Sequence, residues 1–205
     1  GLPVTREHLA TSADEAADAA RDIGFPVALK VQAPDLVHKT EAGGIALNLG
    51  DADAVRDAFA RLATACPGTI DGILVQEMVR GGCEVFLGMH RDAALGPVIV
   101  LGPGGIHVDL FAEAMSLRLP PFAPGDGEAL LNQAPAVEKL LQGFRGAPAA
   151  DRAALVRLIH DFARFIAATG DAVAAIDLNP VMVLPDGQGA KIVDATIELV
   201  PTPKP

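Results

Sequence analysis

A lysine inside an apolar stretch is the first residue of this sequence whose setting points to chemistry. Lys30 lies in the run FPVALKV, residues 25–31, which is predicted to form a buried strand. A buried ammonium group needs an anionic partner, either a protein carboxylate or the phosphate of a ligand. A polar loop with two glycines follows at 38–44, and glycine lets a backbone approach a ligand closely. Two interpretations are open here: a nucleotide phosphate site, or a lysine paired within the protein and followed by an ordinary hairpin turn.

Oxygen-bearing side chains near the C-terminal end form a second group. Asp177 and Asn179 lie in the run IDLNP, and Asp194 lies in VDA beyond the turn residues 185–187. If the strands on either side of that turn pair, Asn179 and Asp194 could face each other on one side of the hairpin. Mg²⁺ prefers a few oxygen ligands together with water and phosphate oxygens, so this pattern is suited to a Mg²⁺ platform. The alternative is that both residues simply mark strand ends.

A third group lies between these two. Gln76, Glu77 and Val79 end a predicted strand just before Gly81-Gly82, and Glu84 follows that break. Such a strand end can offer backbone groups to the edge of an adenine base, while Glu84 could accept hydrogen bonds from ribose hydroxyls. His38 is the only histidine in the glycine loop. A loop histidine is usually just solvated, but beside phosphates a neutral imidazole can act as a nucleophile or as an acid/base.

Two lobes joined near residues 79–83 are expected to position these groups. The first is predicted to alternate strands and helices, with a helix from Ser12 to Ile23 that starts in a Ser12/Glu15 capping box and a helix to Ala65 capped by Asp51. Little is expected before the first of these helices. The second lobe is predicted to be a mostly antiparallel sheet with helices. Its expected elements are strands at 84–90, 97–101, 172–176, 181–184 and 191–193 and a long helix at 150–169.

Composition narrows the possible functions. A net charge of −10 argues against a nucleic-acid surface, which needs a basic patch, but does not argue against nucleotide binding. No apolar run is long enough to span a bilayer. With only two cysteines and no need for disulfides at 205 residues, a reducing cytoplasm is the expected location. Because the sequence opens at Gly1 rather than Met, we expect a domain of a longer polypeptide or a processed subunit.

Four motifs together resemble one family. They are GFPVALKVQAPDLVHKTEAGGIALNL (24–49), QEMVRGGCEVFLG (76–88), GPVIVLGPGGIHVDL (96–110) and IDLNPVMVLPDG followed by IVDA. In this order they resemble the ATP-grasp domain of nucleoside-diphosphate-forming acyl-CoA synthetases, close to the β subunit of ADP-forming acetyl-CoA synthetase and more distantly succinyl-CoA synthetase. The resemblance implies an α/β (α+β), two-lobed ATP-grasp fold with the nucleotide bound in the cleft between the lobes. The implied lobes are residues 1–79 and 80–200, with 201–205 as a tail.

The resemblance also implies a role for each candidate residue. Lys30 would bind phosphate, and His38, Lys39 and Thr40 would lie in the loop that covers the phosphates. Gln76, Glu77 and Val79 correspond to the adenine-binding strand end, and Glu84 to the ribose-binding acid. Asn179 and Asp194 resemble the Mg²⁺ ligands. His38 is implicated in phosphoryl relay, and Asp177 matches the acid that steadies a phosphohistidine loop.

The implied function is ATP binding within an enzyme that interconverts acyl-CoA, ADP and phosphate with a carboxylic acid, ATP and CoA. ATP or ADP and Mg²⁺ would bind to this chain. CoA would bind to another domain or subunit, which carries the phospho-accepting histidine, and a small carboxylic acid is the other substrate. Two alternatives stay open: a nucleotide-sensing domain of a fusion protein without synthetase turnover, and an ATP-grasp ligase that uses an acyl phosphate without a histidine relay.

Overall fold

The structure is a computed structural model, and it describes residues 1–33, 44–65, 70–105, 115–143 and 146–201. The chain divides into two compact units. The smaller unit is Thr5–Val79, and the larger unit is Arg80–Pro205 together with Gly1–Val4. Among the described helices, none is both long enough and apolar enough to cross a membrane.

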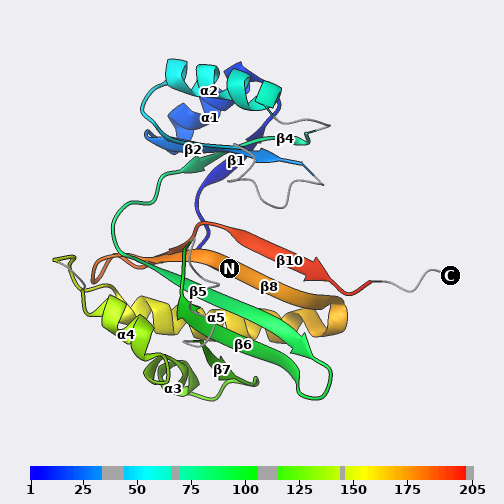
Figure 1. The fold of residues 1–205 in the computed structure, drawn as a ribbon, viewed down its shortest axis with the longest axis vertical. Helices are drawn as coiled ribbons and strands as arrows, with labels where there is room; N and C mark the ends of the chain where they lie inside the picture. The colour runs from blue at the N-terminus through cyan, green and yellow to red at the C-terminus, as the bar shows by residue number, and fades with distance from the viewer. Residues whose placement is uncertain (34–43, 66–69, 106–114, 144–145, 202–205) are drawn as a thin grey trace. The chain divides into compact units, whose positions relative to one another are not determined.

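The smaller unit is a four-stranded antiparallel sheet with two helices on one face (Figure 1). The sheet order is β1-β4-β2-β3. Alternate strand residues such as Val27, Leu29 and Val75 pack against the helices and are fully buried. The elements are β1 (Glu7–Ala10), α1 (Ala13–Ile23), β2 (Val27–Gln32), β3 (Ile45–Leu49), α2 (Ala52–Ala65) and β4 (Gly72–Glu77).

Both predicted helix starts are present in the smaller unit. The Asp51 carboxylate accepts the Ala54 N–H at 2.8 Å at the start of α2, and the Ser12 hydroxyl accepts the Glu15 N–H at 3.3 Å at the start of α1. The second half of the capping box differs from the prediction. The Glu15 carboxylate accepts the N–H of Thr11, at 2.8 Å, and the Thr11 hydroxyl, at 2.9 Å. Glu15 therefore ties α1 to the strand before it.

The larger unit is a six-stranded sheet with three helices on one face. Its strands run in the order β10-β8-β5-β6-β7, and β9 pairs with β8. Val85, Leu87 and Met89 of β5 and Ile176 and Leu178 of β8 pack on that face with the long helix. The elements are β5 (Cys83–Asp92), β6 (Gly96–Pro103), β7 (Ser116–Arg118), α3 (Asp126–Asn132), α4 (Pro135–Leu141), α5 (Arg152–Thr169), the 3₁₀ turn η2 (Gly170–Ala172), β8 (Val173–Val183), β9 (Ala190–Ile192) and β10 (Ala195–Leu199).

Several elements depart from the sequence prediction. A strand, β1, precedes α1, so the expectation that the chain enters almost at once into a helix is wrong. Three of the four β1 residues are exposed, and all five residues of β10 are exposed, so neither strand buries an apolar face of its own. The strands expected at 172–176 and 181–184 are one continuous strand, β8. The antiparallel pairing of β5 with β6 is confirmed.

Candidate functional site

The smaller unit places Lys30 in β2, between β3 and β4. Its register partners are Ile45 and Leu74, and only 7% of the residue is exposed. Because the neighbours of Lys30 on β2, Leu29 and Val31, face the helices, Lys30 lies on the opposite face of the sheet. Gln76 shares that face, since its register partner on β2 is Ala28, two residues before Lys30. The sheet therefore brings two of the predicted nucleotide-binding residues to one surface.

The end of β4 is already engaged within the smaller unit. The Gln76 Nε2 donates to the Thr5 hydroxyl at 2.7 Å, and the Glu77 carboxylate accepts from the Arg6 Nε at 2.9 Å. The backbone N–H of Glu77 donates to the Arg6 carbonyl, and that of Met78 donates to the Pro26 carbonyl. A base bound at this strand end would therefore have to use backbone groups other than these two N–H donors. His38, Lys39 and Thr40 lie outside the described residues, and their assigned roles stay predictions.

The larger unit brings Asn179 and Asp194 together through the backbone. The Asn179 N–H donates to the Asp194 carbonyl at 3.1 Å, and the Val193 N–H donates to the Pro180 carbonyl at 3.0 Å. The pairing continues into β10, where Ala195 lies opposite Leu178. The two predicted metal residues therefore lie side by side on paired segments of the chain.

A β-bulge sets the position of Asn179. Val85 of β5 pairs with Val181 of β8, and Leu87 pairs with Leu178, so one residue of β5 lies opposite two of β8. The two are Asn179 and Pro180. A bulge tolerates proline within a strand and redirects the adjacent side chain, and bulges are common next to active sites. It also explains how β8 continues through a proline that the sequence suggested would break it.

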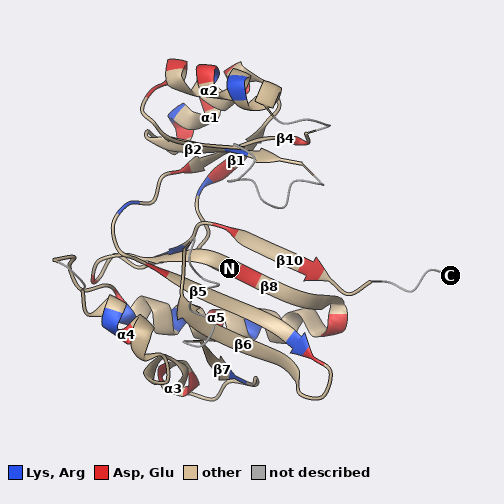
Figure 2. Cartoon of the chain, viewed as in Figure 1, with Lys and Arg blue, Asp and Glu red and all other residues tan. Residues whose placement is uncertain are grey.

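Asp177 lies on the face of β8 away from the core, opposite Gly88 of β5 and Thr196 of β10. Partial desolvation raises the pKa of the Asp177 carboxyl, and the negative charge of Glu198 on β10 adds to that rise, while His90 opposes it. Figure 2 shows acidic residues on the neighbouring strands β8 and β10 of the larger unit. Ionisation of Asp177 therefore costs free energy in the folded protein, and a hydrogen-bond donor placed beside the carboxylate would stabilise it.

Glu84, the second residue of β5, lines a pocket of about 530 Å³ within the larger unit. The other walls include Cys83, Gly104, Lys139 and Leu140, so the pocket combines apolar surface with one cation, Lys139, and one acid, Glu84. Burial raises the pKa of the Cys83 thiol to about 11, so this cysteine stays protonated and is a wall residue rather than a nucleophile. The Glu84 carbonyl accepts the Gly104 N–H at 3.0 Å, which joins the start of β5 to the turn after β6.

The oxygen donors of Asn179 and Asp194 fit a magnesium ion. An amide oxygen and a carboxylate are hard ligands, and Mg²⁺ typically takes one or two protein carboxylates and completes its shell with water and phosphate oxygens. Within the described ranges, no three His, Cys, Asp or Glu side chains are grouped so as to hold a metal. A Mg²⁺ ion here would therefore depend on a phosphate ligand for part of its coordination.

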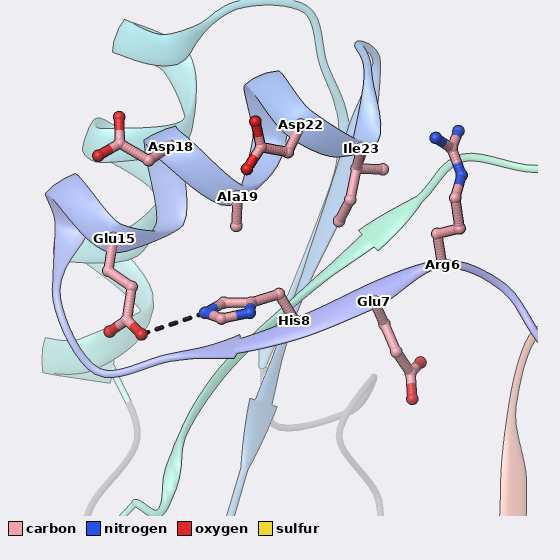
Figure 3. Close-up of a pocket in the computed structure, with 8 residues that line it drawn as sticks. All are labelled: Arg6, Glu7, His8, Glu15, Asp18, Ala19, Asp22 and Ile23. Carbon is pink, nitrogen blue, oxygen red and sulfur yellow. Dashed lines mark hydrogen bonds and ion pairs between the residues drawn. The ribbon is translucent and has the colours of Figure 1, made fainter.

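A second pocket, of about 670 Å³, lies on the smaller unit between β1 and α1 (Figure 3). Its walls carry the acids Glu7, Glu15, Asp18 and Asp22, and the His8 ring lies 3.1 Å from the Glu15 carboxylate. Hydrogen bonds from the Thr11 N–H, His8 and the Thr11 hydroxyl lower the pKa of Glu15 to about 2. The Glu7 carboxylate points away from α1 (Figure 3) and accepts a hydrogen bond from the Gln76 Nε2 at 3.1 Å. The carboxylates of Glu15, Asp18 and Asp22 would repel a phosphate chain, so this pocket is a poor nucleotide site.

A buried strand lysine in one unit and two adjacent oxygen-bearing residues in the other, where each unit is an antiparallel sheet with helices, are features that α+β phosphate- and metal-binding proteins share. Residues 1–199 match the ATP-grasp domain family. The chain belongs to that family.

The curated relatives are CoA ligases. One, from an unknown prokaryotic organism, is a trans-feruloyl-CoA synthase that is 39% identical over 202 residues, covering 95% of this chain and 28% of the relative. Another is the β subunit of acetate–CoA ligase (ADP-forming) II from Pyrococcus furiosus, 32% identical, covering 97% of this chain and 86% of that subunit. This chain thus spans less than a third of the longer relative and most of the separate subunit.

A solved acetyl-CoA synthetase from Ca. Korarchaeum cryptofilum has the same fold. In its complex with coenzyme A, Ca-AMPCP and HgCl⁺, it superposes with a TM-score of 0.90 at 38% identity, covering 98% of this chain and 87% of that chain. A further structure of that protein holds coenzyme A and Mg-AMPPCP, with a phosphohistidine segment pointing towards the nucleotide binding site. The resemblance seen in the sequence motifs and the predicted ATP-grasp fold are both confirmed.

Proposed function

We propose that this chain is the nucleotide-binding part of an ADP-forming acyl-CoA synthetase. In this role it binds ATP or ADP with Mg²⁺ and exchanges the γ-phosphoryl group of ATP with a histidine. The observation that carries the proposal is the juxtaposition of Asn179 and Asp194, joined by a 3.1 Å backbone hydrogen bond, in a chain whose relatives are ADP-forming CoA ligases. The relatives support ligase chemistry over a nucleotide sensor without turnover.

Each group of residues has a stated task in this proposal. Lys30 would neutralise phosphate charge, and its buried setting strengthens that interaction. Asn179 and Asp194 would hold Mg²⁺, which supplies charge neutralisation for the phosphates when bound. Glu84 would bind the ribose, while Gln76, Glu77 and Val79 would border the base. Asp177 would accept a hydrogen bond from the imidazole of the incoming histidine, which would relieve the cost of its ionised form.

In the proposed reaction the γ-phosphoryl group moves from ATP to histidine. The bond between the γ-phosphorus and the oxygen that bridges to the β-phosphate breaks, and ADP leaves with that electron pair. A phosphorus–nitrogen bond to His38 forms. In a second transfer that bond breaks as a phosphorus–nitrogen bond to the incoming histidine forms, and the incoming imidazole retains its single N–H for Asp177. Because the transition state carries little covalent chemistry for the protein to perform, the contribution of this chain is alignment and charge stabilisation. His38 is proposed as the relay histidine of this chain.

A partner is part of the proposal. Another domain or subunit would carry the histidine that accepts the phosphoryl group. CoA and a small carboxylic acid would bind there as well. The solved relative with a phosphohistidine segment pointing towards its nucleotide binding site supports this division of labour. The cytoplasm remains the proposed location, since ATP and CoA are available there.

The experiment is phosphoryl transfer in the full-length protein together with its CoA-binding partner. Incubation with ATP labelled at the γ-position should give a phosphoprotein that is acid-labile and alkali-stable, as phosphohistidine is. Asp194→Asn should reduce Mg²⁺-dependent ATP binding and labelling together by at least tenfold. Asp186→Asn makes the same chemical change at an exposed turn residue and should change neither.

Two results would contradict the proposal. An acid-stable label would exclude a phosphohistidine, and undiminished Mg·ATP binding by Asp194→Asn would remove the metal assignment. Full synthetase activity in His38→Ala would contradict only the relay role of His38 and would leave the rest of the proposed function intact.

A further inference from the structure

The turn after β6 contacts two of the residues assigned to the nucleotide. The Gly104 N–H donates to the Glu84 carbonyl at 3.0 Å. At the next residue, the Gly105 N–H donates to the Asn179 Oδ1 at 2.8 Å, and the Asn179 Nδ2 donates to the Gly105 carbonyl at 3.4 Å. The backbone of one glycine thus binds both ends of the Asn179 carboxamide.

This pair of hydrogen bonds determines which way the carboxamide points. Rotating the amide by half a turn would set Nδ2 against the Gly105 N–H and Oδ1 against the Gly105 carbonyl, and both bonds would be lost. The orientation matters because only the oxygen of an asparagine side chain can bind a hard cation. Oδ1 has two lone pairs, and the Gly105 N–H uses one, which leaves the other for a cation. Gly105 therefore fixes the direction of Oδ1, the only atom of this side chain that could bind a metal.

The same residue lies against the assigned ribose acid. A Cβ added to Gly105 would lie 2.1 Å from the Glu84 Oε2, far inside van der Waals contact. Gly105 also has φ of +87°, a conformation that favours glycine. A side chain at this position would therefore displace the Glu84 carboxylate or move the backbone that holds Asn179.

We propose that Gly105 is a positioning residue of the nucleotide site, which orients Asn179 for the metal and sets the place of Glu84 for the ribose. Metal binding and ribose binding are then coupled through one backbone unit. This inference rests on the proposed function, because it takes the roles of Asn179 and Glu84 from it. What it adds is that Gly105, a residue without a side chain, determines the geometry of both Asn179 and Glu84.

The test uses Gly105→Ala in the full-length protein, with Gly146→Ala as the matched control. Gly146 has φ of +86°, and a Cβ there meets nothing within 4 Å, so the control carries the same backbone strain without the contact. ADP binding is measured by calorimetry over a range of Mg²⁺ concentrations. Gly105→Ala should weaken ADP binding at saturating Mg²⁺ at least tenfold and raise the Mg²⁺ concentration for half-maximal binding at least threefold. Gly146→Ala should change both by less than twofold.

A ligand-free measurement tests the contact itself. Hydrogen exchange of the Gly105 amide should be at least tenfold slower in the parent protein than in Asn179→Ala, because the amide loses its acceptor in the variant. If Gly105→Ala does not fold, this comparison decides, and equal exchange rates would overturn the proposal.

The binding results distinguish the positioning role of Gly105 from the proposed function of the chain. If the parent binds Mg·ADP, and Gly105→Ala matches Gly146→Ala in both ADP affinity and Mg²⁺ requirement, the positioning role is wrong while the proposed function stands. If the parent does not bind Mg·ADP at all, both are overturned.

Discussion

Replacing Asp151 should loosen the helix α5, which packs against β8, the strand of Asn179. Asp151 is 4% exposed and caps α5, where its Oδ1 accepts the Ala154 N–H at 2.9 Å. Its Oδ2 accepts the Gly189 N–H at 2.9 Å, in the turn between β8 and β9. One carboxylate thus joins the start of α5 to the hairpin that carries Asn179 and leads to Asp194.

The expected loss follows from these two bonds. Removing a helix N-cap costs about 1 kcal/mol. Leaving the Gly189 N–H without its charged acceptor costs roughly 1–2 kcal/mol more, at the lower end of the range because Gly189 is only half-buried. Asp151→Ala should therefore lower the free energy of unfolding of the larger unit by about 2–3 kcal/mol, or the melting temperature by roughly 10 °C. Asp151→Asn keeps an oxygen for the cap but not a second acceptor, and should lose about half as much.

Thermal and urea unfolding followed by circular dichroism would measure the series, with Asp161→Ala as the control on the same helix. Asp161 is partly exposed, and its carboxylate pairs with Arg164 one turn away, so its loss should be under about 0.5 kcal/mol. Equal effects of Asp151→Ala and Asp161→Ala would refute the view that the Asp151 carboxylate stabilises the unit by joining α5 to the turn between β8 and β9. Equal effects of Asp151→Ala and Asp151→Asn would refute the assignment of separate bonds to the two oxygens.

Three further predictions concern charge. Lys30→Met should weaken Mg·ATP binding by roughly 10–100-fold, the value of a charge-assisted hydrogen bond, and unchanged affinity in calorimetry would remove Lys30 from the phosphate site. Asp177→Asn should raise the melting temperature at neutral pH, because the raised pKa of Asp177 means that its ionisation costs stability. The difference should shrink as the pH falls through the raised pKa and vanish below the ordinary carboxyl pKa, and a constant difference from pH 3 to 8 would contradict this. Glu15→Gln should lower the melting temperature above pH 4.5, and the difference should shrink as the pH falls towards the Glu15 pKa of about 2; a difference that grows on acidification would contradict it.

The strongly patterned elements of the fold could be predicted from the sequence. The stripe Leu155, Leu158 and Phe162 predicted α5, and Asp51 predicted the start of α2. Among the missed elements, β1 lacks such a pattern, whereas β10, with the sequence ATIEL, alternates apolar and polar residues and could have been predicted from it. β1 and β10 are strands because they pair with β4 and β8, although nearly all of their residues are exposed. The short helices α3 and α4 have seven residues each, too few for a helical period to stand out from the surrounding apolar residues.

The candidate site could be predicted as residue types but not as geometry. Asn179 and Asp194 were expected to face each other across a hairpin, and the structure brings their backbones together. The β-bulge at Asn179 could not be predicted, because it depends on the register of β8 against β5, and that register is a tertiary property. Gly105 was visible only as one glycine in the run GPGG, since its contacts with Glu84 and Asn179 join residues far apart in the sequence.

The sheet of the larger unit explains how β8 can carry an unfavourable charge. Asp177 is desolvated and lies near Glu198, so its ionised form lowers stability. Its neighbours Ile176 and Leu178 are 1% and 3% exposed on the other face, where full burial of such a side chain contributes about 1.5–3 kcal/mol. Since the strand alternates, the apolar face can anchor β8 whatever the charge on the polar face. Asn179 is positioned by the bulge and by the Gly105 N–H, which donates to its side chain, and the Asp151 carboxylate accepts the Gly189 N–H in the turn between β8 and β9. Placement of this kind does not depend on long side chains becoming ordered, and it therefore suits a site that must be ready before the nucleotide binds.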